Sequence, residues 1–347
     1  GVVRHRMGQS EVAVHHLERC LELARSVRHR ARESEALGSL GNVAFRAGDY
    51  EKARDYHAHD LAITREIGNP EGEMGATINL ANIEAMLGLR AEARDRYGRA
   101  LALARDLEDD RAESVCLSNL AMLTYDAGEY ADAQTIYEEG IRLAQKTQNV
   151  ELEGRHTLNL AFLFGEMGAW DQAERRLRES ERILGEASWQ RVLAYIHFAR
   201  AHLHDWQGRA EAADAELLEA IRLQREHDDR VGLAASLEWH ARRRIDQGDT
   251  ITGATVLEEA WALARELRAP DASILVATDR ACLAAAHEAE ARRILALYES
   301  RARVATRIRA RHRLGEAVGN TKDLAEAARL LDHLVAHARP EFRASLQ

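Results

Sequence analysis

The stretch Gly48-Asp49-Tyr50-Glu51-Lys52-Ala53 decides the fold, because versions of it return every forty residues. The repeat glycines keep this spacing without a slip and are Gly8, Gly48, Gly88, Gly128, Gly168, Gly208 and Gly248. An alanine follows five residues after each of the first six glycines, and Gly253 takes that place after the seventh. Strict self-similarity at this period is typical of a solenoid of helical hairpins, in which each repeat packs mainly on its neighbours.

One period, residues 70–109, shows how a repeat is expected to fold. Pro70 suits the first turn of a helix, and apolar residues then recur at spacings of three and four up to Gly88. Gly88 can adopt the positive φ that closes a helix. A second set of small and apolar residues with the same spacing runs from Ala93 to Ala104. The turn between the two helices is so short that they are predicted to be antiparallel.

The composition agrees with a nearly all-helical chain. Of 347 residues only 3 are proline, while 46% are hydrophobic and 30% are charged. Proline is the strongest helix breaker, so its scarcity favours helix throughout. This length would allow two or three ordinary domains. The fixed repeat instead predicts an all-α fold, a single elongated α-solenoid of about eight or nine helical hairpins.

The regularity of the repeat ends after Gly248. We predict a regular array over residues 1–268 with a truncated first repeat, irregular capping helices over residues 269–339, and a short exit segment over residues 340–347. Terminal repeats are expected to be atypical because their outer face meets water or another domain. Residues 1–7 resemble the last turns of a helix, and position 1 is not Met, so we interpret the chain as a fragment of a longer protein.

The repeat resembles the tetratricopeptide repeat (TPR). The family pattern joins an Asn-Leu-Gly-Asn segment to a later Gly-Asp/Glu-Tyr and a following alanine. It stands here as Leu40-Gly41-Asn42 followed by Gly48-Asp49-Tyr50, and it returns as Asn79-Leu80-Ala81-Asn82, Asn119-Leu120-Ala121 and Asn159-Leu160-Ala161. Later copies depart from it, with Ala199-Arg200-Ala201 and Trp239-His240-Ala241 in place of the asparagines.

This resemblance implies a right-handed superhelix whose first helices line a concave face. The forty-residue type is similar to kinesin light chains, Pins-type polarity adaptors and the sensor arrays of bacterial multidomain regulators, including STAND and AAA ATPase-linked ones. The family is a binding scaffold with many unrelated partners, so the resemblance implies binding without naming the ligand.

Positions six and nine residues before each repeat glycine are expected on the concave face or at its margin. The predicted partner-binding residues are Asn42, Asn79, Asn82, Asn119, Asn159, Phe162, His202, Trp239 and Arg242, with Arg46 and Arg155 beside them. Asparagine carries a donor and an acceptor, so a row of asparagines can pair with the backbone of an extended peptide. The alternative is that these asparagines bond neighbouring helices and set the repeat geometry.

The predicted groove changes character along the chain. Asparagines dominate its early repeats, whereas Phe162, Trp206, Trp239 and Arg242 make the later ones aromatic and basic. This gradient would suit a peptide with one polar end and one apolar, acidic end. The charges next to the row are of mixed sign, so the sequence does not contain the matched set of Lys and Arg that chaperone-binding members use as a carboxylate clamp.

Residues 303–313 hold five arginines and no acidic residue: Arg303, Arg307, Arg309, Arg311 and Arg313. Three interpretations stay open for this segment: a solvated helix face, a docking surface for an acidic domain of the parent chain, and contact with nucleic acid. A net charge of −9 argues against a nucleic-acid footprint over the whole surface. Nucleic acid is therefore the partner that the sequence favours least.

No pattern indicates a metal, a cofactor or catalysis. His57 and His59 are two residues apart, so on a helix they point away from each other and cannot chelate one ion well. His197 and His202 are little better placed. The sequence lacks HExxH, a Walker loop, a GxGxxG segment after a strand and a GxSxG elbow. We expect no enzyme activity, no cofactor and no metal site.

The cellular compartment follows from cysteine usage and hydropathy. The three cysteines, Cys20, Cys116 and Cys282, lie far apart, as expected for small apolar residues in a reducing cytoplasm. No apolar run approaches the length of a membrane span, and no signal-peptide pattern opens the chain. The sequence therefore predicts a cytoplasmic protein that does not enter a membrane.

Together these features predict a non-catalytic scaffold that binds a peptide or protein in its concave groove. We expect it to be the sensor or regulatory region of a larger bacterial signalling or regulatory protein, with other domains of the parent chain as further partners. The alternative is an oligomerisation or intramolecular docking scaffold that holds an effector domain through its C-terminal repeats.

Overall fold

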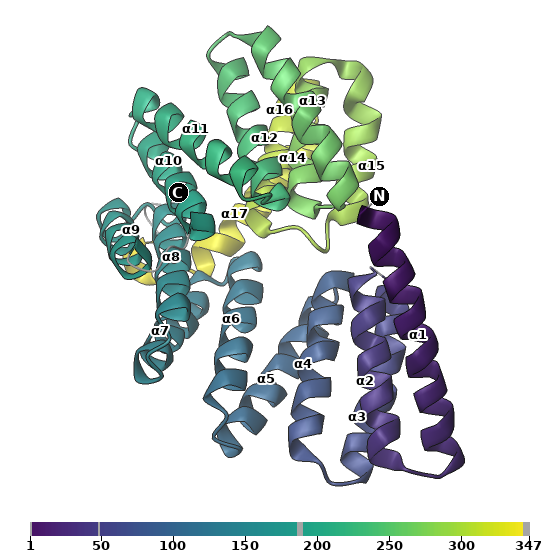
Figure 1. Cartoon of the computed structure of the whole chain (residues 1–347). Coiled ribbons are helices and arrows are strands. Elements are labelled where there is room, and N and C mark those ends of the chain that lie inside the picture. Colours follow the sequence, from purple (N-terminus) through teal and green to yellow (C-terminus); the bar gives the residue numbers. More distant parts are fainter. Residues whose placement is uncertain (1, 48, 186–189, 343–347) are drawn as a thin grey trace. The chain divides into compact units, whose positions relative to one another are not determined.

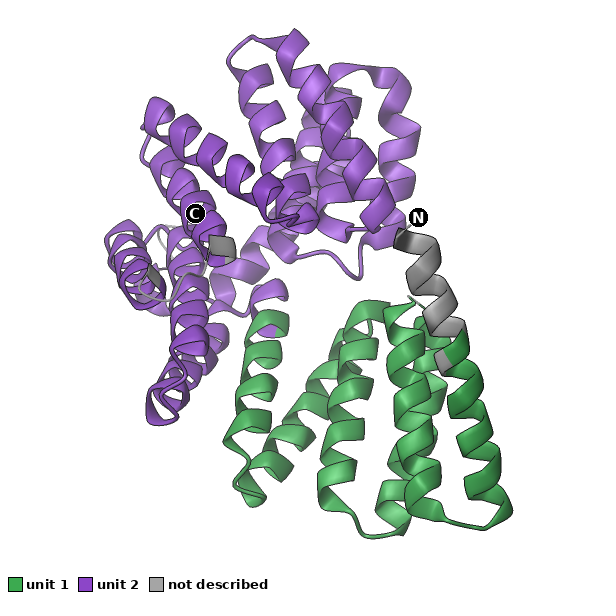
Figure 2. Ribbon diagram, in the orientation of Figure 1, with its two compact units in different colours: residues 1–123 green, residues 124–347 purple. Residues whose placement is uncertain are grey.

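The computed structural model describes residues 2–47, 49–185 and 190–342, and every regular element in these ranges is helical (Figure 1). The predicted all-α fold is therefore confirmed. The chain forms two compact units, unit 1 (residues 1–123) and unit 2 (residues 124–347), shown in Figure 2. The boundary between them falls inside helix α6 (Asp110–Asp126).

Unit 1 begins with a run of helices, α1 to α5, in which each helix packs on the next. Its helices before α6 are α1 (Val2–Ser26), α2 (Arg30–Arg46), α3 (Tyr50–Glu66), α4 (Pro70–Leu87) and α5 (Arg90–Asp106). The alanines predicted to let helix backbones approach are buried, since Ala53, Ala93 and Ala100 are each 0% exposed. The hairpins predicted from the forty-residue period are thus present.

Unit 2 continues the same pattern. Its regular hairpins comprise α7 (Tyr130–Lys146), α8 (Val150–Glu166), α9 (Trp170–Gly185), α10 (Gln190–Trp206), α11 (Ala210–Glu226), α12 (Arg230–Asp246), α13 (Thr250–Leu267) and α14 (Pro270–Leu283). The first helices of successive hairpins also touch one another, α8 with α10 and α12 with α14. A shared face made of first helices follows from these contacts.

The end of unit 2 is less regular. It contains the 3-10 turn η1 (Ala285–His287), α15 (Glu288–Tyr298), α16 (Val304–Val318), α17 (Thr321–Ala336) and the 3-10 turn η2 (Pro340–Phe342). Helix α16 packs on α14 and α17. Residues 343–347, the rest of the predicted exit segment, lie outside the described residues.

The repeat glycines from Gly88 to Gly248 end the first helix of each hairpin. Their φ values are positive, as predicted, at Gly88 (82°), Gly128 (78°), Gly168 (72°), Gly208 (71°) and Gly248 (89°), whereas Gly48 lies outside the described residues. The amide after each glycine bonds a carbonyl five residues back, as in Leu89 N to Glu84 O at 2.8 Å. This bond satisfies a carbonyl that the helix end would leave without a partner. Gly8 does not end a helix, because α1 runs from Val2 to Ser26 without a break, so the expectation that residues 1–7 end a separate helix is wrong.

A second set of positive-φ residues ends the other helix of each hairpin, and most of its members are not glycine. These residues recur at forty-residue spacing: Arg28, Gly68, Glu108, Gln148, Asp228 and Arg268. The position that would fall between Gln148 and Asp228 lies outside the described residues. The residue that follows caps the next helix in several repeats; Asn149 Oδ1, for example, accepts from Leu152 N at 3.1 Å. The sequence reasoning missed this set, because only Gly68 has the expected residue type.

The C-terminal helix α17 returns to the beginning of unit 2 (Figure 1). Ala131 N donates to His337 O at 3.0 Å, and His333 Nε2 lies 3.0 Å from Ala127 O. Leu334 packs so closely on Gly128 that a Cβ there would lie 2.2 Å from Leu334 Cδ2. The last hairpin therefore closes back on α7.

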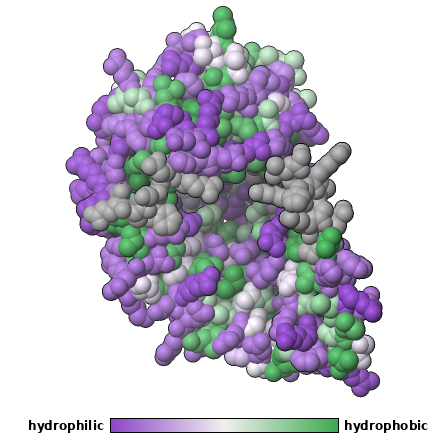
Figure 3. All heavy atoms as spheres, viewed as in Figure 1, coloured by the Kyte–Doolittle hydropathy of each residue, from purple (hydrophilic) through white to green (hydrophobic). Residues whose placement is uncertain are grey.

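On the face seen in Figure 3, hydrophilic residues predominate and apolar residues are scattered between them. Among the helices that the structure describes, none combines the length and the apolarity that a membrane crossing requires.

Candidate functional site

Unit 2 contains a recess on the face made by its first helices. Its volume is about 80 Å³, enough for a few water molecules or one side chain. Helices α8, α10, α12 and α14 supply four sides, and α16 with its preceding residue Arg303 supplies the fifth. The last hairpin thus contributes to a surface that belongs mainly to the regular repeats.

Aromatic rings form one side of the recess. The imidazole of His202 on α10 stacks on the indole of Trp239 on α12, with 3.7 Å between ring centroids and 4° between ring planes. Phe198 stands edge-on to both rings, 4.7 Å from His202 and 5.6 Å from Trp239. Phe162 on α8 extends the cluster, 6.2 Å from Phe198. Such aromatic pairs contribute about 0.5–1.5 kcal/mol each beyond the area that they bury.

His202 is an uncharged member of this cluster at neutral pH. Burial lowers its pKa well below the usual value of 6.5, and the charges of Arg309, Arg242 and Arg303 lower it further. A neutral imidazole keeps one N–H donor and one acceptor nitrogen while it stacks like an aromatic ring. His202 can therefore offer a ligand both an apolar face and a hydrogen bond.

The structure brings together the aromatic residues that the repeat spacing selected. Phe162 and His202 lie six residues before their repeat glycines and Trp239 lies nine before, and all three line the recess. Trp206, which the sequence analysis places in the later part of the groove, also lines it, whereas Phe198 lines it without having been predicted. Phe198 lies four residues from His202, so helical spacing could have identified it.

Three carboxylates line the recess, and two of them have a clear partner. Glu166 Oε2 accepts a hydrogen bond from Tyr130 Oη at 2.6 Å. Asp271 Oδ1 accepts from the backbone N of Arg303 at 3.0 Å, and Arg303 Nε lies 3.6 Å from it. The third, Glu238, lies near Asp279, and its Oε1 is buried without a hydrogen-bond partner.

Glu238 and Asp279 form a buried acidic pair, 3% and 2% exposed. Burial raises the pKa of Asp279 well above its usual range, and the neighbouring Glu238 carboxylate raises it further. The guanidinium of Arg313 acts in the opposite direction and lowers the pKa of Asp279. Arg313 Nε lies 3.1 Å from Asp279 Oδ1 and completes this buried group.

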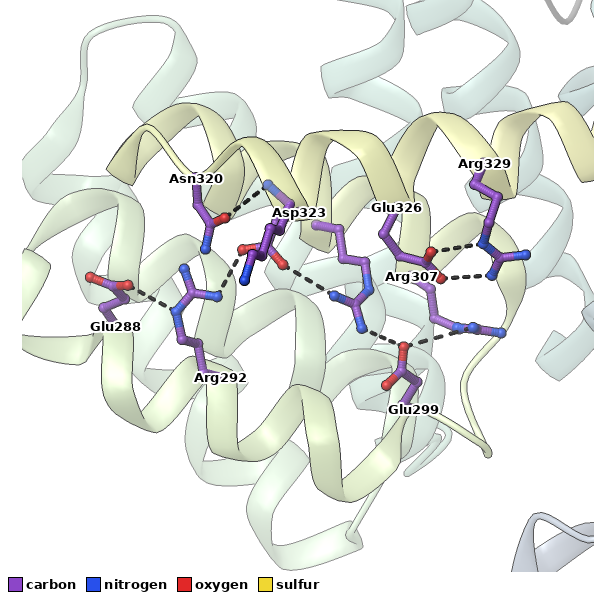
Figure 4. Close-up of polar contacts among 10 residues, drawn as sticks. Glu288, Arg292, Glu299, Arg307, Asn320, Asp323, Glu326 and Arg329 are labelled. Atoms are coloured by element: carbon purple, nitrogen blue, oxygen red, sulfur yellow. Dashed lines mark hydrogen bonds and ion pairs between the residues drawn. The ribbon is translucent and has the colours of Figure 1, made fainter.

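Four arginines of the predicted basic segment form ion pairs inside unit 2. Arg307 and Arg311 face the network drawn in Figure 4, which joins α15, α16 and α17. In it, Arg311 lies 2.5 Å from Glu299 and 3.1 Å from the buried Asp323, which Arg292 also contacts at 2.7 Å. The other two pairs are those of Arg303 with Asp271 and of Arg313 with Asp279.

Arg309 is the member of the segment that faces the recess. It lies two residues from both Arg307 and Arg311, so it projects from the opposite side of α16. Among the described residues, no carboxylate oxygen lies within 4.0 Å of its guanidinium. The same holds for Arg242, three residues after Trp239 on α12.

The predicted asparagines of unit 1 do not gather around a recess as the aromatic residues of unit 2 do. Asn82 Oδ1 accepts from Tyr97 Oη on α5 and from Asn119 Nδ2 on α6, the latter at 3.2 Å. These bonds fit the alternative in which asparagines set the repeat geometry. Asn79 is partly buried, whereas Asn42 is exposed.

The remaining predicted positions are dispersed. Arg46 is exposed on α2 in unit 1. In unit 2, Asn159 is partly buried on α8, and the exposed Arg155 lies 3.8 Å from Glu151 on the same helix. Among the described residues, no group of three His, Cys, Asp or Glu side chains is placed to hold a metal ion.

Comparison with known families gives two matches. The family Tetratricopeptide repeat matches residues 1–66 and 73–146. The family Anaphase-promoting complex subunit 5 matches residues 155–206 and 184–245. No curated protein sequence matches the chain significantly.

The fold is similar to several solved structures, all at low sequence identity. A Rap protein complexed with competence and sporulation factor is 12% identical with a TM-score of 0.64, covering 98% of this chain and 99% of that one. NprR in complex with its cognate peptide NprX is 17% identical with a TM-score of 0.58, covering 83% and 82%. A STAND protein with a tetratricopeptide repeat sensor from Pyrococcus horikoshii is 13% identical with a TM-score of 0.55, covering 95% of this chain and 50% of that one.

These likenesses concern the fold alone. The matched residues 1–66 and 73–146 contain the hairpins of unit 1 and the beginning of unit 2, and the later hairpins keep the same forty-residue period. Residues 1–66 and 73–146 are therefore matched as tetratricopeptide repeats, and the later hairpins share their period and fold.

Proposed function

We propose that unit 2 is a peptide-binding module and that the recess between α8, α10, α12, α14 and α16 is the centre of its binding site. The observation that carries this proposal is the gathering of Phe162, His202 and Trp239 with Arg309 around one recess. Aromatic and arginine side chains provide most of the binding energy in many interfaces, because they bury large areas at a small entropic cost.

The similar structures support this proposal without identifying a ligand. The Rap protein structure is a complex with competence and sporulation factor, and the NprR structure is a complex with its cognate peptide. Both structures cover most of this chain, so a helical scaffold with this fold can bind a peptide.

The proposed role in the cell is that of a non-catalytic sensor or regulatory region in a larger bacterial signalling protein. Peptide capture would stabilise the closed arrangement in which the last hairpin meets both the recess and α7. The STAND protein, whose sensor is a tetratricopeptide repeat, supports this role by analogy. The alternative docking surface on the arginine-rich segment has less support, because Arg303, Arg307, Arg311 and Arg313 form ion pairs within unit 2.

A selection of displayed random peptides against the whole chain tests this proposal. We expect enriched peptides whose affinity falls at least about tenfold in the double variant Phe162→Ala, His202→Ala, since two aromatic contacts are each worth about 1 kcal/mol or more. The matched control is the triple variant Asn79→Ala, Asn119→Ala, Asn159→Ala, which tests the asparagine row separately.

The two variants separate the possible outcomes. Loss of affinity in the aromatic variant, with helicity unchanged by circular dichroism, supports the recess as the site. Loss confined to the asparagine variant would move the site to the asparagine row and contradict the proposal. A chain that enriches no peptide would also contradict it.

A further inference from the structure

Arg309 lines the recess and lacks the carboxylate partner that its neighbours on α16 have. Arg242 lies one helical turn beyond Trp239 and near enough to Arg309 to affect its pKa. Within the described part of the chain, neither guanidinium has a carboxylate oxygen within 4.0 Å. Arg307, on the other side of α16, lies 3.7 Å from Glu299.

The two cations act on each other. Burial lowers the pKa of Arg309 and the positive charge of Arg242 lowers it further, whereas the charges of Glu238 and Glu166 raise it. Two like charges in a partly dehydrated recess cost folding free energy unless an anion compensates them. This cost in folding free energy needs an explanation, because many other arginines of the chain do have a carboxylate partner.

The carboxylates of the recess compensate these charges only in part. Glu238 and Glu166 raise the pKa of Arg309, but neither has an oxygen within 4.0 Å of its guanidinium, and Asp271 is held by Arg303. The guanidinium donors of Arg309 and Arg242 are thus left for a group from outside the chain. A carboxylate matches the planar fork of a guanidinium and can accept two parallel hydrogen bonds from it.

We infer that the recess receives the carboxylate side chain of a glutamate or aspartate in the bound peptide, with Arg309 as its main contact and Arg242 as its second. This inference rests on the proposed function and names the chemistry of the ligand. A neighbouring apolar residue of the peptide would cover Phe162 and the ring pair of His202 and Trp239.

The recess opens toward the groove, and its volume of about 80 Å³ accommodates one carboxylate side chain. We assign the carboxylate to a side chain within the peptide, and the two libraries described next distinguish it from a free chain end.

The test uses two displayed libraries, both selected on the whole chain. In the first library, the random heptapeptide is flanked on both sides by constant Gly-Ser segments, so it has no free carboxyl end. In the second, the random heptapeptide ends in a free carboxylate. Selection is repeated on the double variant Arg242→Gln, Arg309→Gln and on the control Arg307→Gln, whose arginine lies on the same helix but faces Glu299.

The expected result is enrichment of a Glu or Asp next to an apolar residue in the first library. For a selected peptide, replacing that acid by Gln or Asn should weaken binding by about 10- to 100-fold, the range for a charge-assisted contact. The double variant should lose the same factor and should then no longer distinguish the acid from its amide. The control should behave like the unchanged chain.

Three outcomes would overturn the inference. Enriched peptides without an acidic residue would contradict it while leaving the proposed function standing. Enrichment confined to the free-carboxylate library would assign the recess to a chain end. An absence of binders in both libraries would remove the proposed function itself, and the inference with it.

Discussion

The imidazole of His202 lies flat on the indole of Trp239, with 3.7 Å between ring centroids and 4° between ring planes. The two rings come from α10 and α12, the first helices of adjacent hairpins, so this stack joins two repeats. It also lines the recess. One contact therefore serves both the packing of unit 2 and the proposed binding site.

Removing the indole should destabilise unit 2. Trp239 is 2% exposed within the largest apolar cluster described for this unit. We expect Trp239→Ala to lower the free energy of unfolding by about 3–5 kcal/mol, the usual cost of deleting a large buried ring. Urea denaturation measures this change. Trp170, which is 40% exposed in the same unit, is the control, and Trp170→Ala should cost less than about 1 kcal/mol. Equal losses in both variants would contradict the assigned packing.

The contact between α17 and α7 can be measured at a glycine. Gly128 and Gly208 have nearly the same φ, 78° and 71°, so alanine should cost about 1–2 kcal/mol of backbone strain at either position. At Gly128 the new Cβ would also lie 2.2 Å from Leu334 Cδ2, whereas no such neighbour lies within 4 Å at Gly208. We expect Gly128→Ala to be the more destabilising variant in urea denaturation. The excess should shrink when Leu334→Ala is added; equal costs for the two glycines would show that α17 does not pack there.

The second set of positive-φ residues predicts a stabilising substitution. Gln148 has a φ of 55°, which costs a residue with a side chain about 1–2 kcal/mol and costs glycine nothing. We expect Gln148→Gly to raise the melting temperature of unit 2. Arg142→Gly, at an exposed position inside α7, should lower it because glycine weakens a helix interior by about 0.5–1 kcal/mol. A lower melting temperature in both variants would contradict the positive φ assigned to Gln148.

Buried histidines should make both units less stable in mild acid. Burial lowers the pKa to about 4 for His57 in unit 1 and for His156 in unit 2. Since the unfolded value is 6.5, the unfolded state binds more protons below that pH. Their contribution is complete above pH 6.5 and is lost as the pH falls toward 4, at up to about 1.4 kcal/mol per pH unit for each histidine.

Urea denaturation at a series of pH values between 7 and 5 tests this dependence. His57→Gln should flatten the dependence for unit 1, whereas His59→Gln, at an exposed position on the same helix, should leave it unchanged. A slope that survives in the first variant would assign the acid sensitivity to other groups.

The sequence predicts the fold well because the repeat is local. Each hairpin depends on a glycine, a short turn and apolar spacing within forty residues, so counting back from Gly168, Gly208 and Gly248 also located Phe162, His202 and Trp239. These positions share a face because consecutive first helices are stacked. No long-range information was needed.

The sequence does not predict what depends on contacts between distant segments. Arg309 reaches the recess because α16 packs on α14, far from α8 along the chain. Arg307 and Arg311 are paired because their side of α16 meets Glu299 and Asp323, which the sequence alone does not show. Asn82 is hydrogen-bonded to Tyr97 and Asn119, and the spacing of residues in the first helices does not by itself predict these bonds.

The most direct test of the central claim is photo-crosslinking of a selected peptide. Phe162 is replaced by p-benzoylphenylalanine in one variant, exposed Trp170 in a second and exposed Asn42 of unit 1 in a third. If the recess is the peptide-binding site, irradiation with the labelled peptide should give a covalent product at position 162 and at neither control. A product at position 42 or 170, with none at position 162, would contradict the assignment of peptide binding to the recess of unit 2.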